Sequence, residues 1–245
     1  MPHEVTPKGL LLDYGGTLVE EVRFDRRAGT EALLARAVHV PAHISIEQVM
    51  ARVNRVTMEV ADRRDEFQLE TPWPTLTRLI YDFLGIRFAE PMAELEMLFW
   101  KASVTTMPMP GAREALEHFH RSGVRMAVVS NCLYSPDVLR YELGKHGLTD
   151  RLEFIVVSAE YSVRKPHALL LETAAAKLGL ACNDIWYVGD RLDTDVAGAK
   201  AAGMKAVWFQ PGNASRQSSD DSILEVASWQ ELLHSFSGAS SSRGW

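Results

Sequence analysis

The second half of the chain alternates short apolar runs with helical stretches, and this alternation constrains the fold more than any other feature. The apolar runs predict strands at 124–130, 154–157, 185–188 and 205–209. The segments around them predict helices at 112–122, 136–146, 167–178, 195–202 and 229–236. Such alternation implies a mainly parallel sheet with right-handed crossovers. Because residues 9–13 read as a further strand buried on both faces, we predict an α/β core with a mainly parallel sheet.

The segment between the first strand and this alternating region has a different character. Residues 20–105 show helical periodicity without clear strands, including a helix at 28–39. Ser45 and Gln48 have the spacing of a capping box that opens a helix running to about Asp65. We therefore expect an all-helical insertion at 20–105 within a core formed by 1–19 and 106–236, followed by a disordered tail at 237–245.

Composition excludes several classes of protein. The 245 residues carry 26 Lys and Arg against 32 Asp and Glu, and this net charge of −6 argues against general nucleic-acid binding. The two cysteines, Cys132 and Cys182, cannot form a disulfide framework and fit a reducing compartment. The polar N-terminus and the lack of a long apolar run predict neither secretion nor a membrane span. We expect a cytoplasmic monomer or homodimer with no nucleic-acid or membrane partner.

Polar residues gather where the predicted strands end, which is where doubly wound sheets bind ligands. Asp13, Ser130 and Asp190 each end or follow a strand, and Lys165 lies between a strand and the next helix. Two carboxylates about 4 Å apart repel by roughly 4 kcal/mol at an effective dielectric constant of 20. A hard cation bound by oxygen ligands relieves this repulsion, and Mg²⁺ suits such a site beside a phosphate. One carboxylate can then attack phosphorus, with Ser130 and Lys165 holding the phosphoryl oxygens.

Four motifs occur in the order found in the haloacid dehalogenase (HAD) superfamily of hydrolases, which this chain resembles. They are Asp13-Tyr14-Gly15-Gly16-Thr17-Leu18, Val128-Val129-Ser130-Asn131, Arg164-Lys165-Pro166 and Gly189-Asp190-Arg191-Leu192-Asp193-Thr194-Asp195. The match covers the chain except its tail. The resemblance implies an α/β fold whose Rossmann-like core is a doubly wound parallel sheet, and the insertion resembles the helical cap of the C1 subclass.

The resemblance also implies roles for individual residues in a phosphatase that acts on a small phosphorylated metabolite. Asp13 resembles the nucleophile that forms an aspartyl-phosphate, and Lys165 the residue that orients it. Ser130 and Asn131, with Gly16 and Thr17, would bind the substrate. The expected ligands of Mg²⁺ are Asp13, the backbone carbonyl of Gly15, Asp190 and Asp195.

Gly15 is a departure from the family's phosphatases, which carry an aspartate at that position as a general acid and base. The backbone carbonyl survives this change, so metal binding is compatible with it. Proton transfer by that side chain, which typically contributes about 10²–10⁴-fold to the rate, is lost. Substrates with good leaving groups would suffer least. Nearby candidates for a replacement acid are Glu20, Glu21 and Asp25.

Other functions stay open at this point. Gly15 also suits dehalogenase-type cleavage of a carbon–halogen bond, or a catalytically weak binding or regulatory protein. Nucleic-acid binding is supported only by a short arginine run at 23–27. Among the other residues, Asp195 suits a helix N-cap, Asp193 a solvated loop, Cys132 a bystander thiol, and Trp73, Phe99 and Trp100 the core of the cap.

Overall fold

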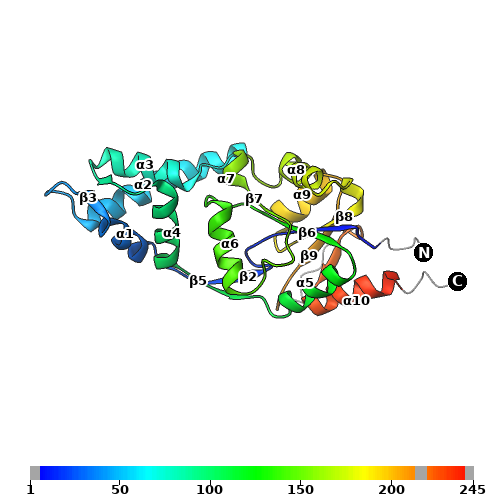
Figure 1. The fold of residues 1–245 in the computed structure, drawn as a ribbon. Helices are drawn as coiled ribbons and strands as arrows, with labels where there is room; N and C mark the ends of the chain where they lie inside the picture. Colours follow the sequence, from blue (N-terminus) through cyan, green and yellow to red (C-terminus); the bar gives the residue numbers. More distant parts are fainter. Residues whose placement is uncertain (1–5, 213–219, 241–245) are drawn as a thin grey trace.

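The computed structural model describes residues 6–212 and 220–240, which form an elongated molecule with two lobes (Figure 1). One lobe is built on a parallel sheet of six strands in the order β10-β9-β8-β1-β6-β7. These strands are β1 (Gly9–Leu12), β6 (Arg125–Ser130), β7 (Ile155–Val157), β8 (Ile185–Gly189), β9 (Lys205–Phe209) and β10 (Leu224–Val226). The predicted α/β class with a doubly wound parallel sheet is therefore confirmed.

The register of the central strands sets where the chain can place functional groups. β1 lies between β6 and β8, with Leu12 paired to both Val128 and Val188. The carboxyl ends of these three strands therefore meet at one edge of the sheet. Asp13 continues from β1, and its backbone N–H donates to the carbonyl of Val188 over 2.9 Å.

Helices cover both faces of the sheet, because side chains of the buried strands alternate between the faces. Leu10 and Leu12 pack with the cluster that contains Phe119 and Trp229, whereas Leu11 packs with the opposite cluster. Helices α8 and α9 lie on one side of the sheet and α5 and α10 on the other (Figure 1). The helices of this lobe are α5 (Ala112–Arg121), α6 (Pro136–Lys145), α7 (Ser158–Tyr161), α8 (Ala168–Leu178), α9 (Ala197–Ala201) and α10 (Trp229–Ser240).

The second lobe, here called the helical lobe, is the insertion between β1 and α5. Its helices are α1 (Arg26–Leu34), α2 (Ile46–Phe67), α3 (Trp73–Phe83) and α4 (Met92–Ser103). Two antiparallel strands, β2 (Val19–Phe24) and β5 (Val104–Pro108), join it to the sheet lobe. The predicted capping box is confirmed, because the Ser45 hydroxyl accepts from the Gln48 N–H and the Gln48 side chain accepts from the Ser45 N–H.

The prediction that residues 20–105 contain only helices is wrong. Besides β2 and β5, a short strand β3 (Ala37–His39) pairs with β4 (Arg87–Phe88), so the helix predicted at 28–39 ends at Leu34. These strands are not evident in the sequence because they are short and most of their side chains are exposed, so they lack the apolar alternation of a half-buried strand.

The end of the chain also differs from the prediction. β10 was not predicted and adds an edge strand beside β9. Helix α10 continues past the predicted end at residue 236 to Ser240. Part of the predicted polar loop, 213–219, and the last residues of the predicted tail, 241–245, lie outside the described residues. Among the described helices, none combines the length and the apolar character needed to cross a membrane.

Candidate active site

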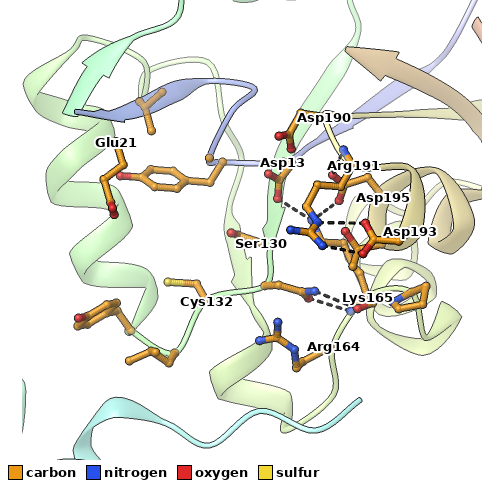
Figure 2. Close-up of a pocket in the computed structure, with 18 of the residues that line it drawn as sticks. Asp13, Glu21, Ser130, Cys132, Arg164, Lys165, Asp190, Arg191, Asp193 and Asp195 are labelled. Atoms are coloured by element: carbon orange, nitrogen blue, oxygen red, sulfur yellow. Dashed lines mark hydrogen bonds and ion pairs between the residues drawn. The ribbon is translucent and has the colours of Figure 1, made fainter. Parts of the chain in front are cut away.

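The ends of β1, β6 and β8 open into a pocket of about 830 Å³ between the two lobes. Asp13, Ser130, Lys165, Asp190 and Asp195 all line it, so the structure brings together residues that are up to 182 positions apart in the sequence. Figure 2 shows Asp13, Asp190, Asp193 and Asp195 on one side of this pocket and Glu21 on the other, with Ser130 and Cys132 between them. The lining also includes Gly15 and Asn131.

Lys165 is the centre of a buried cluster of charges. Its Nζ lies 2.6 Å from Oδ1 of Asp13 and 2.6 Å from Oδ1 of Asp195. The same ammonium group donates to the hydroxyl of Tyr187 over 2.6 Å and to the carbonyl of Val129 over 3.1 Å. Lys165 is 3% exposed, so burial alone would lower its pKa, but the two carboxylates outweigh that effect and raise the pKa. The lysine therefore stays protonated.

Asp195 is held in place by the turn that follows β8. A π-helical turn at Leu192–Val196 begins this segment, and Oδ2 of Asp195 accepts from the Arg191 N–H over 3.1 Å. Gly189 is required here, because a Cβ at this position would overlap the Asp195 carboxyl group. The predicted helix at 195–202 thus begins as a π turn and becomes α9, and Asp195 is fully buried against the site.

Burial and mutual repulsion both affect the pKa values of the carboxyl groups in the pocket. Burial raises the pKa of Asp13 to about 7, and the charge of Asp195 adds to this effect while Lys165 opposes it. Burial and the nearby Asp195 also raise the pKa of Asp190. One oxygen from each of Asp13, Asp190 and Asp195 lies within 4.8 Å of the others. Three carboxylates at this spacing favour a bound cation, and their oxygen-only donor set fits Mg²⁺.

Asn131 fixes the loop that carries Lys165. Its side-chain amide donates to the carbonyl of Lys165 over 2.9 Å, and its Oδ1 accepts from the N–H of Lys165 over 2.8 Å. These two bonds join the end of β6 to the loop before α8. Ser130, at the last position of β6, is 5% exposed and lies beside Asp13 on the pocket wall (Figure 2).

The glycines after Asp13 have different surroundings. A side chain at Gly15 would meet nothing within 4 Å, so the space above this residue is open. Gly16 has a φ of +71°, and a Cβ there would overlap the carboxylate of Asp190, so this residue must be glycine for steric reasons. Thr17 is completely buried, and its carbonyl accepts from the indole of Trp229 over 3.0 Å. Neither Gly16 nor Thr17 is among the residues that line the pocket.

The three candidates for a replacement acid are spread over the beginning of the helical lobe. Glu21 lines the pocket from β2, on the side away from the aspartates (Figure 2). Asp25 instead caps α1, where its Oδ1 accepts from the Ala28 N–H over 2.9 Å. Glu20 is exposed and lies outside the pocket lining. Of the three, only Glu21 faces the pocket.

The structure also shows the surroundings of Asp193 and Cys132. Asp193 is exposed and pairs with Arg191 at the pocket mouth, with 2.6 Å between Oδ2 and Nη2. Cys132 lines the pocket, but burial raises the pKa of its thiol to about 12. A thiol with this pKa is a poor nucleophile at neutral pH.

Sequence reasoning missed other residues of the site. Tyr187 lies on β8, where its hydroxyl bonds Val129 and Lys165 and lies 3.3 Å from Asp195. The available signal was a tyrosine within a strand that the sequence predicts to be fully buried. A buried tyrosine hydroxyl usually has a hydrogen-bond partner. Arg164 was quoted only as part of a motif, yet it lines the pocket and pairs with the buried Glu70.

A doubly wound sheet with a buried lysine and three carboxylates at its strand ends is the architecture of an α/β enzyme. The family model of haloacid dehalogenase-like hydrolases matches residues 7–203. The chain therefore belongs to the haloacid dehalogenase-like hydrolases, and it is a hydrolase.

Two relatives show how this family match extends over the chain. A phosphoserine phosphatase of Thermus thermophilus is 25% identical over 92% of this chain and 98% of its own length. A ribulose-1,5-bisphosphate 5-phosphatase of Halopiger xanaduensis is 31% identical over 118 residues. That alignment spans 48% of each protein, so the chain matches about half the length of this relative.

Solved structures share the fold. A HAD phosphatase of Thermococcus onnurineus has a TM-score of 0.60 at 22% identity, over 94% of this chain and 98% of its own. A 2-haloacid dehalogenase of Pseudomonas syringae has a TM-score of 0.63 at 18% identity, over 94% of this chain and 97% of its own. Because phosphatase and dehalogenase structures score alike, these neighbours establish the fold and leave the reaction to the site.

Proposed function

We propose that this hydrolase is a Mg²⁺-dependent phosphatase that acts on a small phosphorylated metabolite through an aspartyl-phosphate at Asp13. The observation that carries the proposal is the arrangement of Asp13, Lys165, Asp190 and Asp195 at one end of the sheet. The relatives that align with this chain include phosphoserine, glyceraldehyde 3-phosphate and phosphoglycolate phosphatases.

The donor set fits a magnesium ion. Asp13, Asp190 and Asp195 supply carboxylate oxygens within reach of one another, and the exposed backbone of Gly15 lines the same pocket. When bound, Mg²⁺ would neutralise charge on these carboxylates and on the phosphate. This role matches the raised pKa values of Asp13 and Asp190, because burial and the charge of Asp195 both disfavour their ionised forms in the absence of a cation.

The chain's own residues divide the remaining work. Oδ of Asp13 attacks phosphorus, and the bridging oxygen leaves with the electron pair of the broken P–O bond. Lys165 holds Asp13 in position and offsets its charge, while the Ser130 hydroxyl binds a phosphoryl oxygen. Water then attacks phosphorus, which breaks the bond to Asp13 and releases phosphate.

Three residues predicted to bind substrate suit other roles. Asn131 uses both ends of its amide on the backbone of Lys165, so we assign it to positioning that lysine. Gly16 gives room to the Asp190 carboxylate, and Thr17 supports the loop from within the core. In this proposal, only Ser130 among the predicted substrate-binding residues contacts the phosphoryl group.

We further propose that residues 1–19 and 106–236 act as the catalytic core and residues 20–105 as a C1-type cap. The helical lobe supports this division, because it enters and leaves the core through the paired strands β2 and β5. The pocket lies between the two lobes and takes side chains from both. A cytoplasmic location and a monomeric or homodimeric state stay predictions.

Phosphate release with and without Mg²⁺ tests the proposal, with Asp13→Asn as the decisive variant. Turnover of p-nitrophenyl phosphate or of metabolite phosphates should require Mg²⁺ and vanish in the variant. Unchanged activity in Asp13→Asn would remove the nucleophile assignment. Metal-independent halide release from a haloacid would instead establish the dehalogenase alternative. Failure of Mg²⁺ with beryllofluoride to raise the melting temperature would favour a binding or regulatory protein.

A further inference from the structure

A second cavity, here called the aromatic cavity, adjoins the active-site pocket inside the helical lobe. It has a volume of about 300 Å³ and is walled by side chains of α1, α2, α3 and α4 and of the loop after β6. It shares five lining residues with the active-site pocket, namely Glu21, Arg64, Trp100, Leu133 and Tyr134. The two spaces therefore adjoin where these five side chains line both of them, and the aromatic cavity lies on the helical-lobe side.

Most side chains that line this cavity are aromatic or aliphatic, and the rest are three threonines with Glu21, Arg26 and Arg64. Trp73, Phe99 and Tyr134 line it, and their ring centroids lie 5.5–6.4 Å apart. The ring planes of Phe99 and Tyr134 differ by 23°, and the ring of Trp100 meets Tyr134 edge-on. These side chains form the core of the lobe, as predicted, but they also enclose space. A dry apolar cavity of about 150 Å³ can bind benzene, so this one has room for an aromatic group.

An independent observation concerns the leaving group. The position at which the family's phosphatases carry a general acid is Gly15, and the space where a side chain would stand is open. Glu21, the one replacement candidate that faces the pocket, lies across it from Asp13 (Figure 2). Because position 15 has no side chain to donate a proton to the bridging oxygen, the site favours leaving groups that depart as stable anions. Phenols form such anions far more readily than alkyl alcohols.

On the basis of the proposed phosphatase function, we propose that the substrate is an aryl phosphate whose aromatic body occupies the aromatic cavity. Asp13 then forms a bond to phosphorus while the bond from phosphorus to the phenolic oxygen breaks. The electron pair of that bond stays on the phenolic oxygen, which leaves as a phenolate. Hydrolysis of the aspartyl-phosphate by one water gives phosphate, and the proton from that water balances the phenolate.

Inhibition by non-hydrolysable analogues tests binding of the aromatic ring separately from departure of the leaving group. In 2-naphthylmethylphosphonate a methylene replaces the bridging oxygen of an aryl phosphate, and ethylphosphonate presents the same head without a ring. With Mg²⁺ present, we expect the aromatic compound to inhibit at a concentration at least tenfold lower, because only its ring can enter the cavity. Equal inhibition constants for the two compounds would overturn the assignment of the cavity.

Two substitutions in α2 test whether the ring of the aromatic phosphonate binds in the aromatic cavity. Val53 is half-buried and lines the aromatic cavity, whereas Met58, on the same helix, is 71% exposed. Val53→Phe fills the cavity, so it should raise the inhibition constant of the aromatic phosphonate most of the way to that of ethylphosphonate. The inhibition constant of ethylphosphonate should stay unchanged. Met58→Phe adds a ring outside the cavity and should change neither constant. Thr57→Leu, at a second lining position, provides the same test if Val53→Phe folds poorly.

The outcomes distinguish this inference from the proposed function. If the wild-type protein hydrolyses no phosphate ester in the presence of Mg²⁺, the proposed function fails. If it hydrolyses alkyl phosphates as well as aryl phosphates, and Val53→Phe keeps its preference for the aromatic phosphonate, the function stands and the aryl assignment fails.

Discussion

The ammonium group of Lys165 lies 2.6 Å from Oδ1 of Asp13, and this buried ion pair crosses the centre of the site. Lys165 lowers the pKa of Asp13, whereas burial and Asp195 raise it to about 7. The lysine is thus what keeps the nucleophile ionised near neutral pH.

Lys165→Met should therefore lower phosphatase activity by at least about 10²-fold, as expected when a buried charge aimed at the reacting groups is removed. It should also shift the acidic limb of the pH–activity profile to higher pH, because the pKa of Asp13 rises when the lysine is gone. The measurement is kcat/KM between pH 5.5 and 9 with a fixed Mg²⁺ concentration. Loss of activity without this shift would mean that Lys165 acts elsewhere than on Asp13.

The raised pKa of Asp13 also predicts how the metal-free protein responds to pH. Between the ordinary aspartate pKa of 3.8 and about 7, the folded state keeps a proton on Asp13 that the unfolded state has lost. Stability from this group therefore falls as pH rises through that window, by at most about 4 kcal/mol for a shift of this size.

Asp13→Asn removes this titration. Without metal, the melting temperature of the variant should rise above that of the wild type at pH 8 and approach it at pH 4.5. Thermal melts in a chelator at both values of pH test this, since groups common to both proteins cancel in the difference. A difference that does not depend on pH would show that the pKa of Asp13 is not raised.

Glu142 on α6 links the two lobes through a buried network. Its oxygens accept from the Trp100 indole over 2.9 Å, from the Thr106 hydroxyl over 2.5 Å and from Lys145 over 2.8 Å. Burial would raise the pKa of Glu142, but these bonds outweigh it and lower the pKa. Trp100 and Thr106 also line the active-site pocket, so the network supports the pocket wall.

Glu142→Ala removes the acceptor of the buried Trp100 indole and leaves the Thr106 hydroxyl with His146 Nε2, 2.7 Å away, as a partner. The loss of the acceptor for the indole should cost about 1–3 kcal/mol of unfolding free energy. Glu142→Gln keeps one acceptor oxygen and should cost less. Denaturant unfolding of the two variants against the wild type tests the order. An alanine variant as stable as the glutamine variant would contradict a role for these hydrogen bonds.

The site was predictable where it depends on strand ends. Asp13, Ser130 and Asp190 were found because parallel strands bring their carboxyl ends to one edge of a sheet. The mutual approach of Lys165 and Asp195 depends on the conformation of two loops, so periodicity alone did not predict it. Their positions after predicted strands indicated the same edge of the sheet, the resemblance to the family implied their roles, and the structure supplies their contacts.

Features that arise from packing between distant segments were not predictable. The aromatic cavity needs the relative placement of four helices, and its walls read in the sequence as ordinary core. Tyr187 was missed because it lies among the apolar residues of β8 and therefore reads as core, although its hydroxyl accepts a hydrogen bond from Lys165. The short strands β2 and β5 were missed because their exposed side chains carry no apolar period.

Gly15→Asp should restore a general acid to the site. The open space around Gly15 admits a side chain, and the backbone there does not have the positive φ that would exclude one. Because proton donation helps poor leaving groups most, we expect kcat for an alkyl phosphate to rise at least about tenfold. An activated aryl phosphate such as p-nitrophenyl phosphate should change little. Gly15→Asn, which has the same shape and no transferable proton, should not reproduce the gain for the alkyl phosphate. An equal gain in both variants would show that the side chain acts by packing rather than by proton transfer.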